Sequence, residues 1–281
     1  MASLPPIPEK RSGFRLFLMT VLGRSYPRVI GMQREKSWLF FDTFLPMLGV
    51  AGYVFVYRAL QAPEDYIGFV VVGGAMTAFW MNILWSMSSQ LYWEKETGNL
   101  PLYIIAPGPM MAILLGMALG GLVATTLRAT VIILLGSLLF NVQYVVVSLP
   151  LLLLIFFVAM VALYGMGMTT ASLFLLLSRE AWHIANLAQE PVFFLSGFYF
   201  PIKNFPFWLA AAASLLPLTL GLDAMRQLAF ATGPSLGFLS PAIELLILVA
   251  LAAIFLVAAR WLLNKMEKLA VREGRLTESR R

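Results

Sequence analysis

The sequence contains no cysteine, a single histidine and few charged residues. Without cysteine there can be no disulfide and no Cys-based metal or nucleophilic site. No lysine follows a glycine, so the phosphate-binding motif GxxxxGK[ST] is absent. Paired-carboxylate and Ser/His/Asp patterns are missing too, and His183 has no acidic partner at ligand spacing. We therefore expect no enzymatic activity and no catalytic, cofactor-binding or metal site in this chain.

Charged residues make up 12% of the 281 residues, against about 25% in ordinary soluble domains. Hydrophobic residues make up 60%, and the mean hydropathy is +0.83. Apolar runs of about 20 residues, the length that crosses a bilayer as a helix, recur along the chain. They are continuous rather than alternating, which disfavours a β-barrel. The sequence predicts an all-α polytopic membrane protein in contact with membrane lipids.

Six apolar segments are predicted to cross the membrane. They lie at about 38–58, 66–91, 109–140, 145–177, 182–200 and 241–263. The third is too long for one straight span and is rich in glycine, so we expect tilt or a kink. Its Gly116 and Gly120 form a GxxxG pattern, which permits close helix approach, as in a dimer contact.

The N-terminal region has a different pattern. Residues 1–12 contain three prolines and are interpreted as a tail. Apolar residues then recur at helical spacing from Phe14 to Leu22, which predicts a helix lying in the membrane interface and ended by Pro27. A leader of the first span with snorkelling arginines is the alternative.

Basic residues indicate the orientation. Seven precede the first span, seven lie at or after the last, and the net charge is +6. The positive-inside bias places both termini in the cytoplasm, and it accounts for the charge without a nucleic-acid partner. The chain then divides into a tail and interfacial helix (1–36), a six-span domain (37–263) and a basic cytoplasmic tail (264–281).

Two interruptions lie on opposite faces in this topology. The cytoplasmic stretch 93–107 carries charged residues followed by an apolar patch closed by Pro107, and it is longer than a passive loop needs. We interpret it as a docking segment. On the outer face, residues 201–217 are apolar but contain three prolines, and we predict a pair of short helices that dip into the membrane and return.

Three ionisable residues inside the predicted spans are singled out: Arg128, Glu190 and Glu244. A charge in hydrocarbon costs at least about 2.5–3.5 kcal/mol, so each should meet a partner or water. Counting along the spans places Glu190 near mid-depth, Arg128 further out and Glu244 near the outer surface. An Arg128–Glu190 pair is one hypothesis. The alternative is that Arg128 and Glu244 snorkel to the outer interface.

Two motifs resemble the ABC-2 type transporter permeases. The first runs from Glu94 to Leu100 and continues with Ile105-Ala106-Pro107. The second, more specific motif comprises Ser196-Gly197, Phe200-Pro201, Pro206, Trp208-Leu209, Pro217-Leu218-Thr219, Asp223 and Arg226. The resemblance covers essentially the whole chain. Pro101 stands where many relatives carry an acidic residue.

The resemblance implies the membrane half of an ABC exporter in the plasma (inner) membrane. Such a permease pairs with a second copy or a paralogue and with two copies of a separate ATPase subunit, which holds the ATP and Mg. It also implies that 93–107 is a coupling helix and that the re-entrant hairpin 201–217 closes the outer end of the path. The implied coupling residues are Glu94, Glu96, Gly98, Leu100, Leu102 and Pro107, and those of the outer gate are Gly197, Pro201, Pro206, Trp208, Pro217, Asp223 and Arg226.

We expect Glu94 and Glu96 to meet basic residues on the ATPase, and Leu100 and Leu102 to fill an apolar groove. The cargo is expected to be amphipathic or lipid-like, such as a drug, a lipid or a lipid-linked glycan. An ion-coupled secondary transporter is the alternative, and it would favour broken helices in both halves of an inverted repeat.

Overall fold

The protein is a bundle of helices, and we describe it from a computed structural model. The structure describes residues 13–34, 36–177, 180–230 and 233–272, and no strand occurs among them. The elements are α1 (Phe14–Arg34), α2 (Lys36–Ala59), α3 (Asp65–Met81), the π-helix η1 (Asn82–Ser88), α4 (Gln90–Glu96), α5 (Leu100–Ile105), α6 (Met110–Phe140), α7 (Leu149–Leu177), α8 (Glu180–Leu195), the 3-10 helix η2 (Ile202–Asn204), α9 (Phe207–Ala213), α10 (Pro217–Ala229), α11 (Gly233–Leu236) and α12 (Pro241–Arg272).

The span from α3 to α4 forms the centre of the bundle. Its most apolar window is 94% buried, whereas those of α2 and α12 are 22% and 28% buried. α3 is apolar on all sides, which is typical of a helix enclosed by others. α2 and α12 instead expose large apolar side chains outward, as helices in contact with lipid do.

Five of the described helices are long and apolar enough to cross a membrane. A sixth is reached if α9 and α10, which meet at 106°, count as one broken span. The predicted span 182–200 corresponds to α8, which has 16 residues and contains Pro191. At 1.5 Å per residue it covers about 24 Å, short of the roughly 30 Å of hydrocarbon. α8 is therefore not among the five spanning helices.

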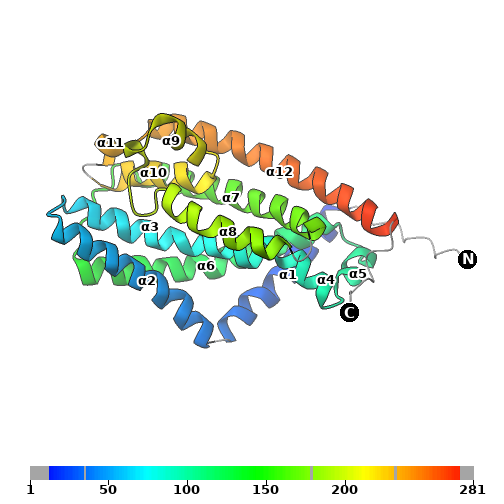
Figure 1. Cartoon of the computed structure of the whole chain (residues 1–281). Coiled ribbons are helices and arrows are strands. Elements are labelled where there is room, and N and C mark those ends of the chain that lie inside the picture. The colour runs from blue at the N-terminus through cyan, green and yellow to red at the C-terminus, as the bar shows by residue number, and fades with distance from the viewer. Residues whose placement is uncertain (1–12, 35, 178–179, 231–232, 273–281) are drawn as a thin grey trace, which may run out of the picture.

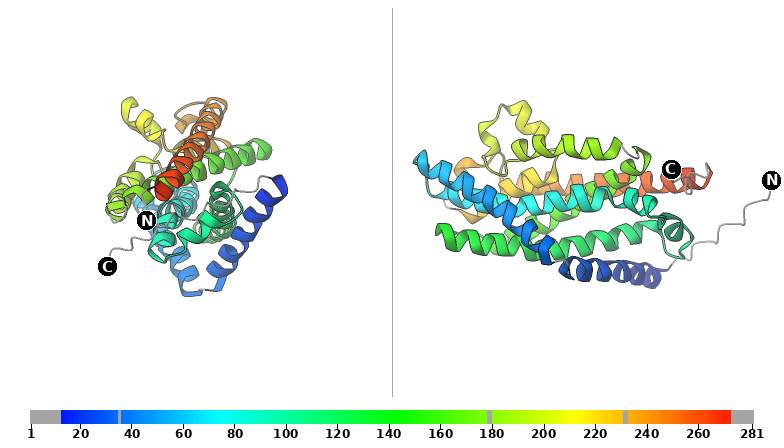
Figure 2. Two further views of the ribbon diagram at one scale, coloured as in Figure 1. Left: turned by 90° about the vertical axis from the view of Figure 1, so that its right-hand side faces the viewer. Right: turned by 60° about the horizontal axis from the view of Figure 1, so that its bottom comes forward.

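The two ends of the bundle differ (Figure 1). The start of α1, the end of α12 and the α4–α5 pair lie together at one end, and α9, α10 and α11 lie at the other. The right-hand view in Figure 2 shows the same separation. The first and last described helices thus bring their outer ends to the side of the predicted docking segment.

Several predicted boundaries were wrong. Pro27 lies inside α1, which continues to Arg34, because a helix can bend around a proline rather than end there. The third segment, by contrast, was placed correctly, since the predicted 109–140 is the helix α6, Met110–Phe140. α7 begins at Leu149, after an extended stretch whose Val145 and Val147 N–H groups bond to the carbonyls that end α10. The last helix reaches Arg272; the predicted tail 1–12 and residues 273–281 lie outside the described residues.

The GxxxG pattern of α6 packs against α1 of the same chain. A Cβ added to Gly116 would lie 2.6 Å from the Val21 carbonyl oxygen, and one added to Gly120 would lie 2.8 Å from that of Ser25. Glycine at these two positions lets the helix backbones approach closely. The pattern therefore holds α1 on the bundle, and its predicted use as a dimer contact is not what the structure shows.

Candidate functional sites at the two ends of the bundle

The docking segment folds as two short helices joined by a tight turn. Gly98 has φ +76°, the left-handed conformation that glycine adopts without strain. The N–H of Asn99 bonds to the Glu94 carbonyl at 2.8 Å, which closes α4 before α5 begins. Pro101 is the second residue of α5, in the first turn, where its missing N–H has no helical partner to lose. The departure at Pro101 is therefore compatible with a helix.

Glu94 points into the protein rather than outward. Arg24 Nη2 of α1 donates to its Oε1 at 2.5 Å, and Gln90 Nε2 donates to the same oxygen at 2.7 Å. The Arg24 guanidinium also lies 5.1 Å from the centre of the Tyr103 ring. Burial raises the pKa of Tyr103 to about 12, so its hydroxyl remains protonated beside this pair. Glu94 thus joins α4 to α1.

The remaining predicted coupling residues fall on two sides. Leu100 is buried with Leu91 and Ile104, so it fills the core of this chain. Glu96, Gly98, Leu102 and Pro107 are exposed, as are Trp93 and Ile105. The exposed apolar edge formed by Trp93, Leu102 and Ile105, with Glu96 beside it, is here called the α4–α5 edge. The expectation that Glu94 and Leu100 face a partner was wrong, because helical periodicity turns them towards α1 and the core.

A second arginine of α1 reaches the π-helix. Arg28 donates to Gln90 Oε1 at 2.7 Å, and to both the carbonyl oxygen and the hydroxyl of Ser86. Burial lowers the pKa of Arg28, with the nearby Arg24 as a smaller cause. Arg24 and Arg28 are four residues apart and so lie on one face of α1. That face fixes η1 and α4 to α1, a set of contacts that sequence reasoning missed.

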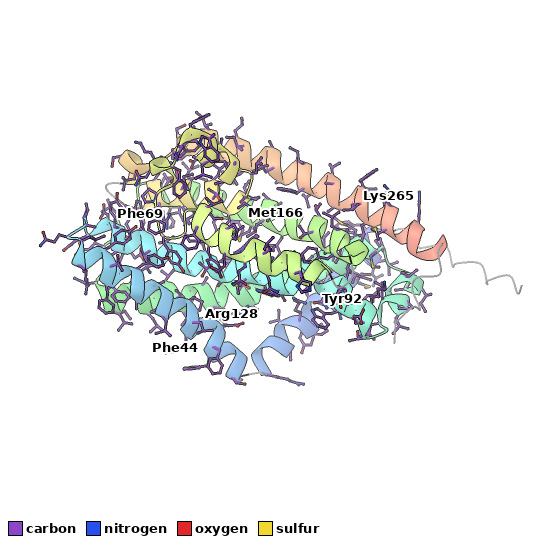
Figure 3. The ribbon with its side chains drawn as sticks, viewed as in Figure 1. Phe44, Phe69, Tyr92, Arg128, Met166 and Lys265 are labelled. Atoms are coloured by element: carbon purple, nitrogen blue, oxygen red, sulfur yellow. The ribbon has the colours of Figure 1, made fainter. Side chains whose placement is uncertain are left out.

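Arg128 has a different partner from the one hypothesised. It forms an ion pair with Asp42 of α2, and its Nη2 lies 3.3 Å from Thr125 Oγ1. Glu190 is exposed on α8, near the Gln189 amide nitrogen at 3.4 Å. In Figure 3 Arg128 lies midway along the bundle, between Phe69 near one end and Tyr92 at the other. The Arg128–Glu190 hypothesis was wrong, because Arg128 pairs with Asp42 and Glu190 lies exposed on α8.

Polar side chains also join the π-helix to its neighbours. Tyr164 donates to Asn82 Oδ1 at 3.0 Å, Ser88 and Thr170 share a 2.5 Å hydrogen bond, and Trp85 Nε1 donates to Gln189. A π-helix contains an extra residue per turn and is often found at functional sites. None of these polar contacts was predicted from the sequence.

At the opposite end, Arg226 of α10 ties three segments together. Its guanidinium is buried and donates to the carbonyl oxygens of Gly197, Phe198 and Phe69 of α3. Gly197 has φ +73°, which turns the chain so that its carbonyl faces Arg226. Gly73 leaves the room for this arrangement, because a Cβ there would lie 1.6 Å from the Phe198 carbonyl oxygen. Gly197 and Arg226 thus belong to one hydrogen-bonded cluster.

Asp223 and Glu244 meet in a second buried cluster. Gln227 Nε2 lies 3.1 Å from Asp223 Oδ2 and 3.5 Å from Glu244 Oε2, and it donates to the Leu239 carbonyl at 2.7 Å. The N–H of Phe238 donates to Asp223 at 2.8 Å. Glu244 is fully buried, so it does not snorkel to the surface as the alternative reading had it. The two acids and Gln227 hold the connection before α12 against α10.

The prolines of the second motif begin elements. Pro201 precedes η2, Pro206 precedes α9, and Pro217 is the first residue of α10. Trp208 on α9 is exposed. The predicted hairpin 201–217 holds the short helices η2 and α9, and the helix that bends sharply from α9 is α10, which runs from Pro217 to Ala229 and is buried throughout. Among the described residues no group of three acidic or histidine side chains is placed to hold a metal.

An all-helical bundle with several helices long enough to cross a membrane, a short helical pair at one end and a sharply bent pair at the other defines a multi-pass membrane protein. The profile of the ABC-2 type transporter family matches residues 18–230. The chain belongs to that family. It is also similar to the probable multidrug ABC transporter permease YbhR of Escherichia coli, from strain K12 and from O157:H7. Each is 24% identical over 164 residues, which is 58% of this chain. The match spans 44% of the length of these relatives.

Proposed function

We propose that this chain is the transmembrane subunit of an ABC exporter whose ATP is hydrolysed by a separate ATPase subunit. The α4–α5 edge is the observation that carries the proposal. It exposes Trp93, Leu102 and Ile105 at one bundle end, on helices that Arg24 and Arg28 fix to α1. Exposed apolar residues on a rigid support are typical of a protein contact. The proposed contact fits a groove on the ATPase, with Glu96 facing a basic residue.

The proposed contact with a cytoplasmic ATPase sets the orientation of the chain in the membrane. The α4–α5 end faces the cytoplasm of a cell with a plasma (inner) membrane, and α1 lies in the interface with Phe14, Leu18 and Leu22 towards lipid. α9 and α10 form the re-entrant pair at the outer face. Two permease chains, identical or paralogous, combine with two ATPase copies that bind the ATP and Mg. The divisions 1–36, 37–263 and 264–281 remain our domain assignment.

The proposed cargo is an amphipathic molecule moved out of the cytoplasm or the inner leaflet. The name of the YbhR relative refers to multidrug transport, which is compatible with such a cargo. The route would run between two chains rather than through one, since the centre of this chain is filled by α3.

The docking role is tested by co-purification of the chain with its ATPase. Leu102→Asp with Ile105→Asp should reduce the recovered ATPase at least tenfold, because charges would replace the apolar contact. The matched control is Leu215→Asp, an exposed leucine between α9 and α10 at the other bundle end. Unchanged recovery with the double variant, or equal loss with the control, would refute the docking surface.

A further inference from the structure

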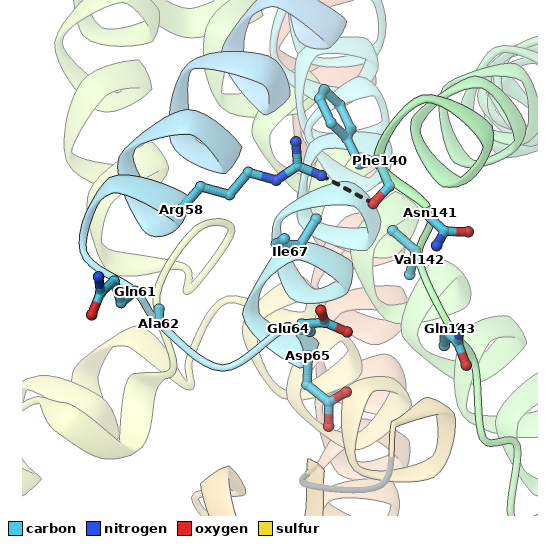
Figure 4. Close-up of a pocket in the computed structure, with 10 residues that line it drawn as sticks. All are labelled: Arg58, Gln61, Ala62, Glu64, Asp65, Ile67, Phe140, Asn141, Val142 and Gln143. Atoms are coloured by element: carbon cyan, nitrogen blue, oxygen red, sulfur yellow. Dashed lines mark hydrogen bonds between the residues drawn. The ribbon is translucent and has the colours of Figure 1, made fainter.

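A pocket lies at the bundle end opposite the α4–α5 edge (Figure 4). Its volume is about 310 Å³. Two connections form its walls, the one from α2 to α3 and the one that follows α6. The charged lining residues are Arg58, Glu64 and Asp65. Neither sequence motif of the family includes them.

The walls of the pocket are fixed by two similar helix ends. Gln61 in the turn after α2 has φ 53°, and Asn141, directly after α6, has φ 56°, a left-handed conformation that is uncommon outside glycine. The N–H groups of Ala62 and Val142 bond back five residues, at 3.0 and 3.1 Å, and close each helix end. The pocket is therefore bounded by defined turns, and both helix ends contribute partial negative charge to it.

The charges in the pocket are separated. Arg58 Nη2 lies 3.4 Å from the Phe140 carbonyl oxygen, and its guanidinium carbon lies 5.8 Å from the centre of the Phe140 ring. This contact engages one of five N–H donors, so the guanidinium retains capacity for an anion. Figure 4 shows Arg58 extending towards Phe140, with the Glu64 and Asp65 carboxylates in the other part of the pocket. A ligand that carries both a negative and a positive group matches this pattern.

The surroundings of the pocket are apolar and exposed. Leu60 lies directly before the wall formed by the α2–α3 connection, and Leu138 and Leu139 lie directly before the wall that follows α6. Their exposed fractions are 70%, 79% and 67%. Phe55 on α2 is exposed as well. A zwitterionic ligand whose apolar part continues along these surfaces has the chemistry of a phospholipid.

We propose that this pocket binds the headgroup of a zwitterionic phospholipid, with the phosphate on Arg58 and the ammonium group on Glu64 and Asp65. The acyl chains lie along the exposed apolar residues of α2 and α6. In the proposed topology the lipid belongs to the outer leaflet. The site is independent of the ATPase contact, so the two proposals can fail separately.

The test uses the full chain purified in detergent and native mass spectrometry of bound lipid. Phosphatidylethanolamine and phosphatidylglycerol with identical acyl chains are compared, because only the first carries the ammonium group. The wild-type protein should retain the ethanolamine lipid better by up to about fivefold, the most that a solvent-accessible ion pair of about 1 kcal/mol supplies. Glu64→Gln with Asp65→Asn should remove that preference, and Arg58→Gln should weaken retention of both lipids.

Glu190→Gln is the matched control, since it removes an exposed carboxylate outside the pocket. It should leave the preference unchanged. Equal retention of the two lipids by the wild type, or an undiminished preference in the Glu64/Asp65 variant, would overturn the proposal. Competition by water-soluble glycerophosphoethanolamine as strong as by the lipid would overturn the lipid assignment and give the pocket to a soluble zwitterion.

Discussion

The contact between α1 and α6 can be broken at its two glycines. Replacing Gly116 and Gly120 by leucine puts side chains where the α1 backbone now lies. The first added carbon alone would lie 2.6 Å from the Val21 carbonyl oxygen at one position and 2.8 Å from that of Ser25 at the other. Ordinary contact begins at 3.4 Å, so both are too close by about 0.6–0.8 Å before the rest of the leucine is placed.

The magnitude follows from the nature of the obstruction. A backbone carbonyl cannot rotate away as a side chain can, so α1 must move as a whole. Overpacking costs about 1–3 kcal/mol at each site. For the pair this is about 2–6 kcal/mol, and because 1.4 kcal/mol is a factor of ten, we expect at least a tenfold loss of docked α1.

The absence of native cysteine makes the assay direct. A Cβ added to Gly108 would lie 3.4 Å from the Thr20 Cβ, close to the 3.5–4.5 Å spacing of a disulfide. Thr20→Cys with Gly108→Cys should therefore cross-link α1 to the connection just before α6 under mild oxidation. Adding the two leucines should reduce the initial cross-linking rate at least tenfold, measured as a gel shift or by mass spectrometry.

Gly52→Leu provides the control, because Gly52 lies in α2 and a Cβ there meets nothing within 4 Å. It should cross-link at the parental rate. If the leucine variants also cross-link at that rate, α1 is not held by the glycines and the reasoning from close approach is refuted.

Three further predictions concern single contacts, each followed by thermal unfolding in detergent. Arg226→Lys should lower the free energy of unfolding by at least about 2 kcal/mol, because an ammonium group lacks the planar set of N–H donors with which the guanidinium reaches three buried carbonyl oxygens. An unchanged melting temperature would contradict this. Asp42→Arg combined with Arg128→Asp should recover part of the stability that each single change loses, whereas Glu190→Gln should be neutral; no recovery would argue against the pair. Pro101→Ala should change stability by less than about 1 kcal/mol, since the first turn needs no N–H, and a larger loss would show a role beyond helix geometry.

The class of fold could be predicted because hydrocarbon imposes a length and a composition on every crossing helix. The same rule failed for α8, since an apolar run does not reveal where Ser196 and Gly197 will turn the chain. Asp42 could have been found, because it lies within a predicted span and a charge there needs a partner. Asp42 was omitted because only three charges within the spans, Arg128, Glu190 and Glu244, were considered.

The inward faces of the site could not be predicted from the local pattern. Helical spacing shows that Glu94 and Glu96 point in different directions, but which one is buried depends on Arg24, seventy residues earlier in the chain. The GxxxG pattern likewise describes a surface that another helix can approach without saying which helix. Both answers come from the docking of α1, a long-range contact.

The π-helix Asn82–Ser88 gives the central span a particular mechanical property. Each π turn contains one residue more than an α turn. The segment can therefore change from π-helix to α-helix by shifting its hydrogen bonds by one residue, while the helices on both sides stay intact. Such a step would advance α4 by about 1.5 Å and rotate it by about 100° relative to α3. It also means that deleting one residue between 82 and 88 should leave the helices on either side intact, whereas the same deletion in the middle of α3 would turn Arg226's acceptor, the Phe69 carbonyl, out of register.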